Sequence, residues 1–370
     1  MILHLITDEK FADYAIKQFS AFAGSSDFVL VQSVDMPLRY VQYAEKVRIV
    51  RYKSEEYNQL LGSISQYACV LSHGLFEPWQ WEIILACPQS VKVAWMFWGG
   101  EVYGLPQCGM RFLSPSARVL YRCKQIAYWL KGKTMTAGIS QVPLSVFKRV
   151  DYCLTDEREE CDFANQLLGT SMQHLWYNYY SIDETVGALI DAQVNGMNIL
   201  LGNSSTFECN HLMIMRKIKS MRLHDQQLIL PLSYGDTWLR ERLLYIGKKW
   251  FGTHFMALTS FMPRDEYNRI MQSCGVVIMP HYRPQAFGNI LTALWLGAKV
   301  FMSKKCIAYP FFKRLGVHFY TVENDLTQEQ LSMPLSANLV QHNRTILSAE
   351  YSVETMLPRI NQLIEHTSVH

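Results

Sequence analysis

The stretch CGVVIMPHYRPQAFGNILTALWLGAKVFMSKK, residues 274–305, decides how this chain folds. Its apolar run 275–279 is short and ends at a proline, which is typical of a buried parallel strand. A polar loop over 281–289, a helical pattern over 290–296 and a second apolar strand over 299–302 follow. Strand, loop, helix and strand in this order predict a doubly wound α/β sheet, in which ligands bind at the carboxyl ends of the strands.

The polar loop in this stretch carries side chains that suit an anionic ligand. An arginine at such a place can hold a phosphate or carboxylate through two parallel hydrogen bonds. His281 is either a further contact to a diphosphate or a simple strand cap. An ordinary surface loop between strand and helix is the alternative interpretation. The residues that we expect to bind the ligand are Arg283, Gln285, Gly288 and Asn289.

Two more apolar strands end in small polar residues. The segment MNILLGNSST, residues 197–206, leads a strand into glycine, asparagine and two serines, and the strand over 227–232 leads into Ser-Tyr-Gly-Asp. Hydroxyls and helix N-termini can face a phosphate, although a serine there can also be a plain helix cap. Three such strand ends predict one ligand cleft along one sheet edge. The added candidates are Gly202, Asn203, Ser204, Ser205, Tyr234 and Gly235.

Length and composition agree with two globular domains. The 370 residues exceed one average core, and the formal net charge of +3 does not demand a nucleic-acid partner. The nine cysteines show no C-x-x-C pair, which favours reduced thiols in a cytoplasmic protein. The start MILHLITDEK lacks the features of a signal peptide, and no apolar run approaches the roughly 20 residues that span a bilayer.

Strand and helix patterns alternate in two blocks, which predicts two doubly wound Rossmann-like domains. We expect the first domain over 1–185 and the second over 186–340. A helical tail over 341–370 is expected to pack back toward the first domain.

Charge is unevenly spread along the chain. From Val102 to Val150 there is no aspartate or glutamate, while basic and aromatic residues are interleaved. This pattern favours docking on anionic lipid headgroups. The alternatives are pairing with the acidic cluster DEREECD at 156–162, or a nucleic-acid groove. The expected membrane contacts are Arg111, Arg118, Arg122, Lys124, Trp129, Lys131 and Lys133.

Two such domains facing each other across a cleft are the GT-B arrangement of nucleotide-sugar glycosyltransferases. The segments SHGLFEPWQW at 72–81 and WMFWGGEVY at 95–103 resemble two landmarks of the bacterial family 56 glycosyltransferases. Glu101 stands where the family pattern has an aspartate. That family moves 4-acetamido-4,6-dideoxygalactose from a thymidine diphosphate donor to the lipid-linked intermediate of enterobacterial common antigen. The resemblance implies an acceptor-binding first domain and a donor-binding second domain.

Two residues are candidates for the base that takes the acceptor proton. His73 and Glu101 each follow a predicted parallel strand, so each is expected at the carboxyl edge. A histidine titrates near neutral pH, whereas a carboxylate needs a raised pKa or acts by orienting the acceptor. The alternatives are a histidine bonded to backbone and a surface carboxylate.

No metal and no cofactor are expected. The chain has no Asp-x-Asp motif, so the leaving diphosphate would be stabilised by helix N-termini, Ser204, Ser205, Arg283 and Tyr234.

Together with these observations, the resemblance to family 56 implies a metal-independent GT-B glycosyltransferase of bacterial surface polysaccharide synthesis. It would move a deoxy or deoxyamino sugar from a nucleotide diphosphate, preferably thymidine diphosphate, to a polyprenyl-diphosphate-linked glycan. Its expected place is the cytoplasmic face of the inner membrane, as a peripheral protein without a nucleic-acid partner. The alternatives are a two-domain nucleotide-sugar epimerase, or a non-catalytic protein that binds nucleotide sugars or lipids.

Overall fold

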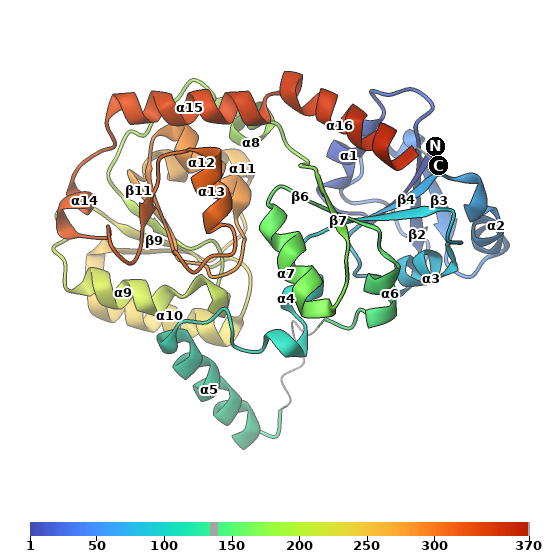
Figure 1. Cartoon of the computed structure of the whole chain (residues 1–370). Helices are drawn as coiled ribbons and strands as arrows, with labels where there is room; N and C mark the ends of the chain where they lie inside the picture. The colour runs from blue at the N-terminus through green and yellow to red at the C-terminus, as the bar shows by residue number, and fades with distance from the viewer. Residues whose placement is uncertain (134–139, 369–370) are drawn as a thin grey trace. The chain divides into compact units, whose positions relative to one another are not determined.

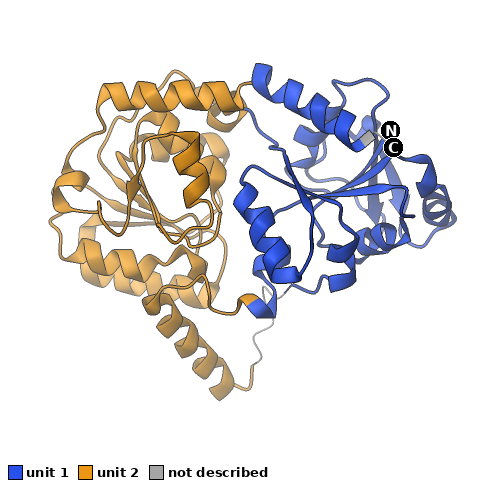
Figure 2. Ribbon diagram, viewed as in Figure 1, with its two compact units in different colours: residues 1–107, 138–181, 353–370 blue, residues 108–137, 182–352 orange. Residues whose placement is uncertain are grey.

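The computed structural model describes residues 1–133 and 140–368. The chain forms two compact units, each assembled from separate segments (Figure 2). Unit 1 comprises Met1–Gln107, Gly138–Ser181 and Val353–His370, and unit 2 comprises Cys108–Ala137 and Ile182–Ser352. The basic stretch before residue 134 therefore lies in unit 2, whereas the sequence assigned it to the first domain. The last helix of the described chain returns to unit 1.

Unit 1 is built on a parallel sheet that has seven strands within the described residues. The spatial order is β3-β2-β1-β4-β5-β6-β7, so β1 lies inside the sheet and the chain winds outward on both sides of it. Continuous apolar runs form these strands because helices cover both faces of such a sheet. The strands are β1 (Ile2–Ile6), β2 (Ser26–Gln32), β3 (Val47–Arg51), β4 (Cys69–His73), β5 (Lys92–Met96), β6 (Tyr152–Thr155) and β7 (Gln173–Trp176).

The helices of unit 1 pack on this sheet, and the last one comes from the far end of the sequence (Figure 1). Helix α16 (Val353–Ser368) packs against β1, β7 and α1 (Ala12–Phe19). The core between them contains Ile2, Phe19, Leu71 and Ile364. The remaining helices are α2 (Glu55–Ser63), α3 (Pro78–Ala86), α4 (Gly100–Tyr103), α6 (Leu144–Arg149) and α7 (Arg158–Leu168).

Unit 2 is built on a second parallel sheet, with six strands among the residues described. Its order is β10-β9-β8-β11-β12-β13, so β9, β8 and β11 are neighbours. Their carboxyl ends therefore share one stretch of sheet edge. The strands are β8 (Ile199–Leu201), β9 (Leu228–Pro231), β10 (Phe255–Leu258), β11 (Val276–Met279), β12 (Lys299–Met302) and β13 (Tyr320–Thr321).

The helices of unit 2 enclose a core that includes Leu201, Leu230, Ile278 and Phe301. Helix α12 is almost wholly buried and packs against α8, α11 and α15. The helices are α5 (Pro115–Leu130), α8 (Ile182–Val186), α9 (His211–Lys219), α10 (Thr237–Phe251), α11 (Arg264–Gln272), α12 (Phe287–Leu296), α13 (Tyr309–Leu315), α14 (Gln328–Ser332) and α15 (Ala337–Tyr351).

The predicted alternation of strands and helices matches these elements closely, but β7 was not predicted. Its sequence, QHLW, is half polar and only partly buried, which is expected for a strand at the sheet edge. In the described part of the chain, no helix is long and apolar enough to cross a membrane. None of the nine cysteines is in a disulfide, and Cys123 is the exposed one.

Candidate functional site

Three loops of unit 2 are tied together at the carboxyl ends of β9, β8 and β11. The side-chain amide of Asn203 donates to the Tyr234 hydroxyl at 2.8 Å. Nε2 of Gln285 donates to Oδ1 of Asn203 at 3.0 Å. One asparagine thus links the loops that follow three neighbouring strands. We call this edge, formed by residues 202–205, 234–235 and 281–289, the unit 2 edge.

The two serines of the first loop hold the loop itself. Both are only 1% exposed. The Ser205 hydroxyl donates to the Tyr234 carbonyl oxygen at 2.8 Å, and the Ser204 hydroxyl lies 3.1 Å from that of Thr206. The Ser205 hydroxyl is therefore already used inside the protein, and the expectation that these side chains face a phosphate needs correction. Ser205 joins the first loop to the loop of Tyr234, and Ser204 contacts Thr206 within its own loop.

Both the backbone conformation at position 202 and the space around it require glycine. Its φ of +68° lies in the left-handed region, and a Cβ there would come 2.7 Å from Nε2 of His211. His211 is fully enclosed, and within the described residues neither ring nitrogen has a hydrogen-bond partner. Burial lowers the pKa of His211, and lowers the pKa of His281 to about 3. The His281 imidazole is thus neutral beside this edge.

The thiol of Cys209 is the centre of a small polar cluster that the sequence did not predict. Its sulfur lies 3.2 Å from Nε2 of Gln285 and 3.3 Å from Oδ1 of Asn203. Burial opposes ionisation of the thiol, but His211 and several hydrogen bonds outweigh burial and lower the Cys209 pKa. A sequence signal for this cluster is the spacing C-x-H that follows the GNSST loop after two residues.

The other predicted donor residues take different places. Arg283 is half-buried, and its guanidinium Nη1 lies 3.5 Å from the Pro284 carbonyl oxygen. Asn289 donates to the Tyr267 hydroxyl on α11 at 3.1 Å, so it joins two helices. A Cβ at Gly288 would meet its nearest neighbour, a Thr185 methyl carbon, only at 3.9 Å. Space therefore does not require glycine at position 288.

In unit 1, Glu101 is a buried carboxylate beyond the carboxyl end of β5. It is 1% exposed, and its Oε1 accepts from the Trp95 indole at 3.3 Å. In the part of the chain described, its Oε2 is enclosed without a hydrogen-bond partner. Burial raises the Glu101 pKa to about 7, although nearby backbone amides oppose the shift. A carboxylate of this kind can take or give a proton near neutral pH.

His73 does not present a free nitrogen. Its Nδ1 lies 2.8 Å from the Tyr179 hydroxyl, and its Nε2 lies 3.1 Å from Nδ1 of His4. It is 3% exposed, and burial lowers its pKa to about 3. The prediction that His73 is the base is therefore corrected, because both nitrogens are occupied inside the protein. Glu101 remains as the candidate base.

A chain of hydrogen bonds runs through His73. The Trp98 indole donates to the Tyr179 oxygen at 3.1 Å, and the Tyr179 hydroxyl lies 2.8 Å from Nδ1 of His73. At the other end, Nε2 of His4 lies 3.1 Å from the Ser26 hydroxyl. These hydrogen bonds hold Trp98 in place at the sheet edge.

The basic stretch of unit 2 is divided between an exposed and a buried face of α5. Lys124 is 7% exposed and is ion-paired with Asp236, so its assignment to the membrane contacts is corrected. By contrast, the side chains on the outer face are exposed. They are Arg118, Val119, Arg122, Ile126, Trp129 and Leu130, followed by Lys131 and Lys133. Arg111 is exposed as well, in the turn before α5.

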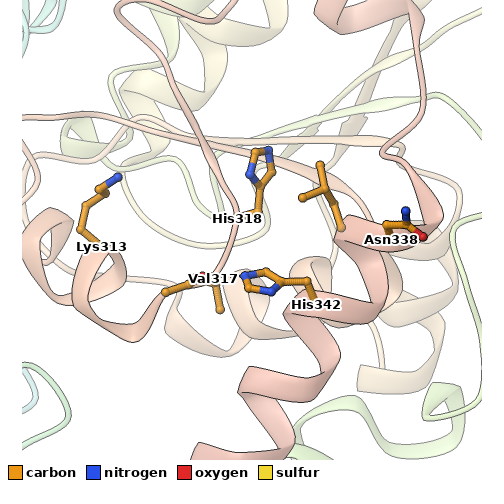
Figure 3. Close-up of a pocket in the computed structure, with 7 residues that line it drawn as sticks. Lys313, Val317, His318, Asn338 and His342 are labelled. Carbon is orange, nitrogen blue, oxygen red and sulfur yellow. Dashed lines mark hydrogen bonds between the residues drawn. The ribbon is translucent and has the colours of Figure 1, made fainter.

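A cavity of about 390 Å³ lies elsewhere in unit 2, between the end of α13 and the start of α15 (Figure 3). It is lined by Lys313, Gly316, Val317, His318, Asn338, Leu339 and His342. None of these residues was a predicted site residue. Among residues 1–133 and 140–368, no group of three or more His, Cys, Asp or Glu side chains is placed to hold a metal ion.

No protein-family model matches the chain, and no curated protein sequence matches it. Solved structures match it over nearly its whole length. HepE from Anabaena, in complex with UDP and glucose, matches with a TM-score of 0.62 at 11% sequence identity. The match covers 99% of this chain and 99% of the HepE chain. Sucrose-phosphate synthase from Thermosynechococcus elongatus has a TM-score of 0.62 at 11% identity, with 99% of this chain and 98% of that chain covered.

A glycosyltransferase from Rickettsia africae has a TM-score of 0.63 at 10% identity, again with 99% and 98% of the two chains covered. The chain has the GT-B fold. The predicted fold class, two doubly wound sheets in one chain, is thereby confirmed. At sequence identities of 10% and 11%, the similarity to these structures shows the fold alone.

Proposed function

We propose that this chain is a glycosyltransferase that uses a nucleotide diphosphate sugar as donor. The observation that carries the proposal is the unit 2 edge, where Asn203 ties together the loops after β8, β9 and β11. In open α/β sheets this edge is the ligand site. Arg283 lies in the third of these loops, where its guanidinium can meet a diphosphate. HepE, which shares the fold, is solved with UDP and with UDP-glucose.

The acceptor is proposed to bind unit 1, with Glu101 as the base. In the reaction, the acceptor hydroxyl loses its proton to the Glu101 carboxylate as its oxygen bonds to the anomeric carbon of the sugar. The bond from that carbon to the diphosphate breaks, and the nucleoside diphosphate leaves with the electron pair. A base with a pKa near 7 suits this step, since it is ionised in part at neutral pH.

The finer identity of the substrates rests on the resemblance to family 56. We propose a deoxy or deoxyamino sugar carried by thymidine diphosphate, and a polyprenyl-diphosphate-linked glycan as acceptor. We propose that no metal takes part. The leaving diphosphate would be stabilised by Arg283, by Tyr234 and by the N–H groups of the loop backbone.

A lipid-linked acceptor lies in a membrane, so an enzyme that uses it needs a surface that binds membranes. Helix α5 has such a surface. Its exposed face combines Val119, Ile126, Trp129 and Leu130 with basic neighbours. Apolar side chains of this kind enter the interface of a bilayer, and each lysine or arginine near anionic lipid adds about 1 kcal/mol. We propose that α5 docks the protein on the cytoplasmic face of the bacterial inner membrane.

Calorimetric titration with thymidine diphosphate and with uridine diphosphate, each with and without EDTA, tests the donor site. We expect micromolar binding of one nucleotide that survives EDTA. Absence of binding to both would remove the basis for the donor site. Binding that EDTA abolishes would keep the donor site and overturn the metal-free mechanism. An epimerase would convert the bound sugar without an acceptor, and a binding protein would show no turnover.

A further inference from the structure

Aromatic side chains gather around Glu101 at the carboxyl edge of the sheet in unit 1. One of them is Phe76, which is 46% exposed. Its ring atoms lie 3.1 Å from the positions that a Cβ would take at Gly74 and at Gly100. The Cβ position of Gly74 is in turn 3.7 Å from Oε1 of Glu101. The Phe76 ring therefore lies across two glycines, next to the carboxylate.

Trp98 extends the aromatic surface beside Phe76. Its ring centroid lies 5.7 Å from that of Phe76 and 5.0 Å from that of Phe11. The hydrogen bond from its indole to Tyr179 fixes the orientation of the ring. Both Phe11 and Trp98 are partly exposed. Three rings from three different loops thus form one accessible apolar surface, which we call the aromatic platform.

The Glu101 carboxylate near the aromatic platform has an oxygen that can accept a hydrogen bond from a ligand. Oε2 of Glu101 is enclosed and, within the described residues, accepts no hydrogen bond. A buried acceptor without a partner costs free energy, which a hydroxyl group placed there would recover. Glu101 is only 1% exposed, so a hydroxyl can reach Oε2 only after a side chain that covers the carboxylate moves.

We propose that Phe76, Trp98 and Phe11 form the subsite for the sugar ring of the acceptor that receives the transferred sugar. The apolar face of a pyranose stacks on aromatic rings, while its hydroxyls at the edge remain free for polar contacts. One of those hydroxyls meets Glu101. Trp95 takes no part because it is fully buried in the core. This inference rests on the proposed function, and it names the class of ligand that unit 1 binds.

The test is saturation-transfer NMR on the full chain with methyl glycosides of N-acetylglucosamine, mannose and glucuronic acid. We expect the wild type to transfer saturation to the protons on one face of at least one of these rings. Phe76→Ala and Trp98→Ala should reduce that signal by about fivefold or more. Tyr245→Ala, which removes a 63% exposed aromatic on α10, is the matched control and should leave the signal unchanged.

No signal from any glycoside in the wild type, or equal signals in wild type and platform variants, would overturn the subsite. Trp98→Phe keeps an aromatic ring if Trp98→Ala fails to fold, and it should retain more signal than Phe76→Ala. Titration of the same variants with thymidine and uridine diphosphates separates the two proposals. Intact nucleotide binding without glycoside signals refutes only the subsite, whereas lost nucleotide binding in the wild type refutes the proposed function.

Discussion

The ammonium group of Lys124 on α5 is ion-paired with the carboxylate of Asp236, the residue that caps α10. The other oxygen of Asp236 accepts from the Leu239 backbone amide at 2.8 Å, so one carboxylate stabilises a helix start and anchors α5. The side chains of Lys124 and Asp236 are 8% and 20% exposed. By contrast, Arg118 and Arg122 on the outer face of α5 are exposed.

Lys124→Met is therefore expected to destabilise the protein rather than to weaken membrane binding. Removing one partner leaves Asp236 as a largely buried charge, which costs roughly 3 kcal/mol. Urea unfolding measures the change, and Lys131→Met, at an exposed lysine beyond the same helix, is the control. Equal stability of both variants would show that the pair contributes little.

Charge reversal on the exposed face of α5 should release the protein from membranes. Arg118→Glu, Arg122→Glu and Lys131→Glu together exchange three attractions of about 1 kcal/mol for repulsions. We expect sedimentation with vesicles containing phosphatidylglycerol to fall by at least tenfold. Arg242→Glu, Lys248→Glu and Lys249→Glu, on the exposed side of α10, form a matched control with the same net change. Undiminished sedimentation of the α5 variant would refute the docking surface.

Glu101→Gln should abolish sugar transfer while nucleotide binding persists. In the wild type, turnover should rise as pH increases through about 7, because the ionised carboxylate is the active form. Glu157→Gln is the control, since burial also raises the pKa of Glu157 to about 7. Near-normal turnover in Glu101→Gln would exclude this carboxylate as the base.

The raised pKa of Glu101 also predicts how stability depends on pH. Between the ordinary value of 4.5 and about 7, the folded state holds a proton that the unfolded state has lost. This group therefore makes stability fall as pH rises through that window. At pH 8, Glu101→Gln should be more stable than the wild type by on the order of 1–3 kcal/mol. At pH 4 the difference should vanish, and denaturant titrations at both values provide the comparison.

Asn203→Ala should weaken binding of the nucleoside diphosphate by about tenfold or more. The substitution leaves Tyr234 and Gln285 without their shared partner, and a lost hydrogen bond of this kind costs on the order of 1–2 kcal/mol. Calorimetry measures the change in affinity. Tyr245→Phe on α10 should bind as the wild type does. Unchanged affinity in Asn203→Ala would show that the linked loops do not form the donor site.

The strand and helix pattern of the sequence was sufficient to predict most of the fold. Apolar runs such as 276–279 and 199–201 have few alternatives to a buried parallel strand, because their backbone groups need partners inside the protein. The exception, β7, is an edge strand whose mixed sequence carries little periodic signal. The three polar strand ends were also predictable, since the order of parallel strands brings their carboxyl ends to one edge.

The roles of single side chains were less predictable than their location. His73 was correctly placed at a strand end, but its partners His4 and Tyr179 are 69 and 106 residues away in the chain. Likewise, nothing near Lys124 in the sequence indicated Asp236, which is 112 residues away. A local pattern cannot report partners brought together by folding.

The sequence by itself determined the two parallel sheets and the sheet edges at which polar residues gather, because hydrophobic periodicity and strand-end chemistry are local properties. Only the tertiary structure decided that Glu101 is buried and that both ring nitrogens of His73 have partners. It also decided that Ser204 and Ser205 make their contacts inside the protein. On α5, it exposed one face to solvent and placed Lys124 of the other face in an ion pair with Asp236. These outcomes depend on burial and on partners distant in the chain, which set the pKa values and the free hydrogen-bonding capacity of each group.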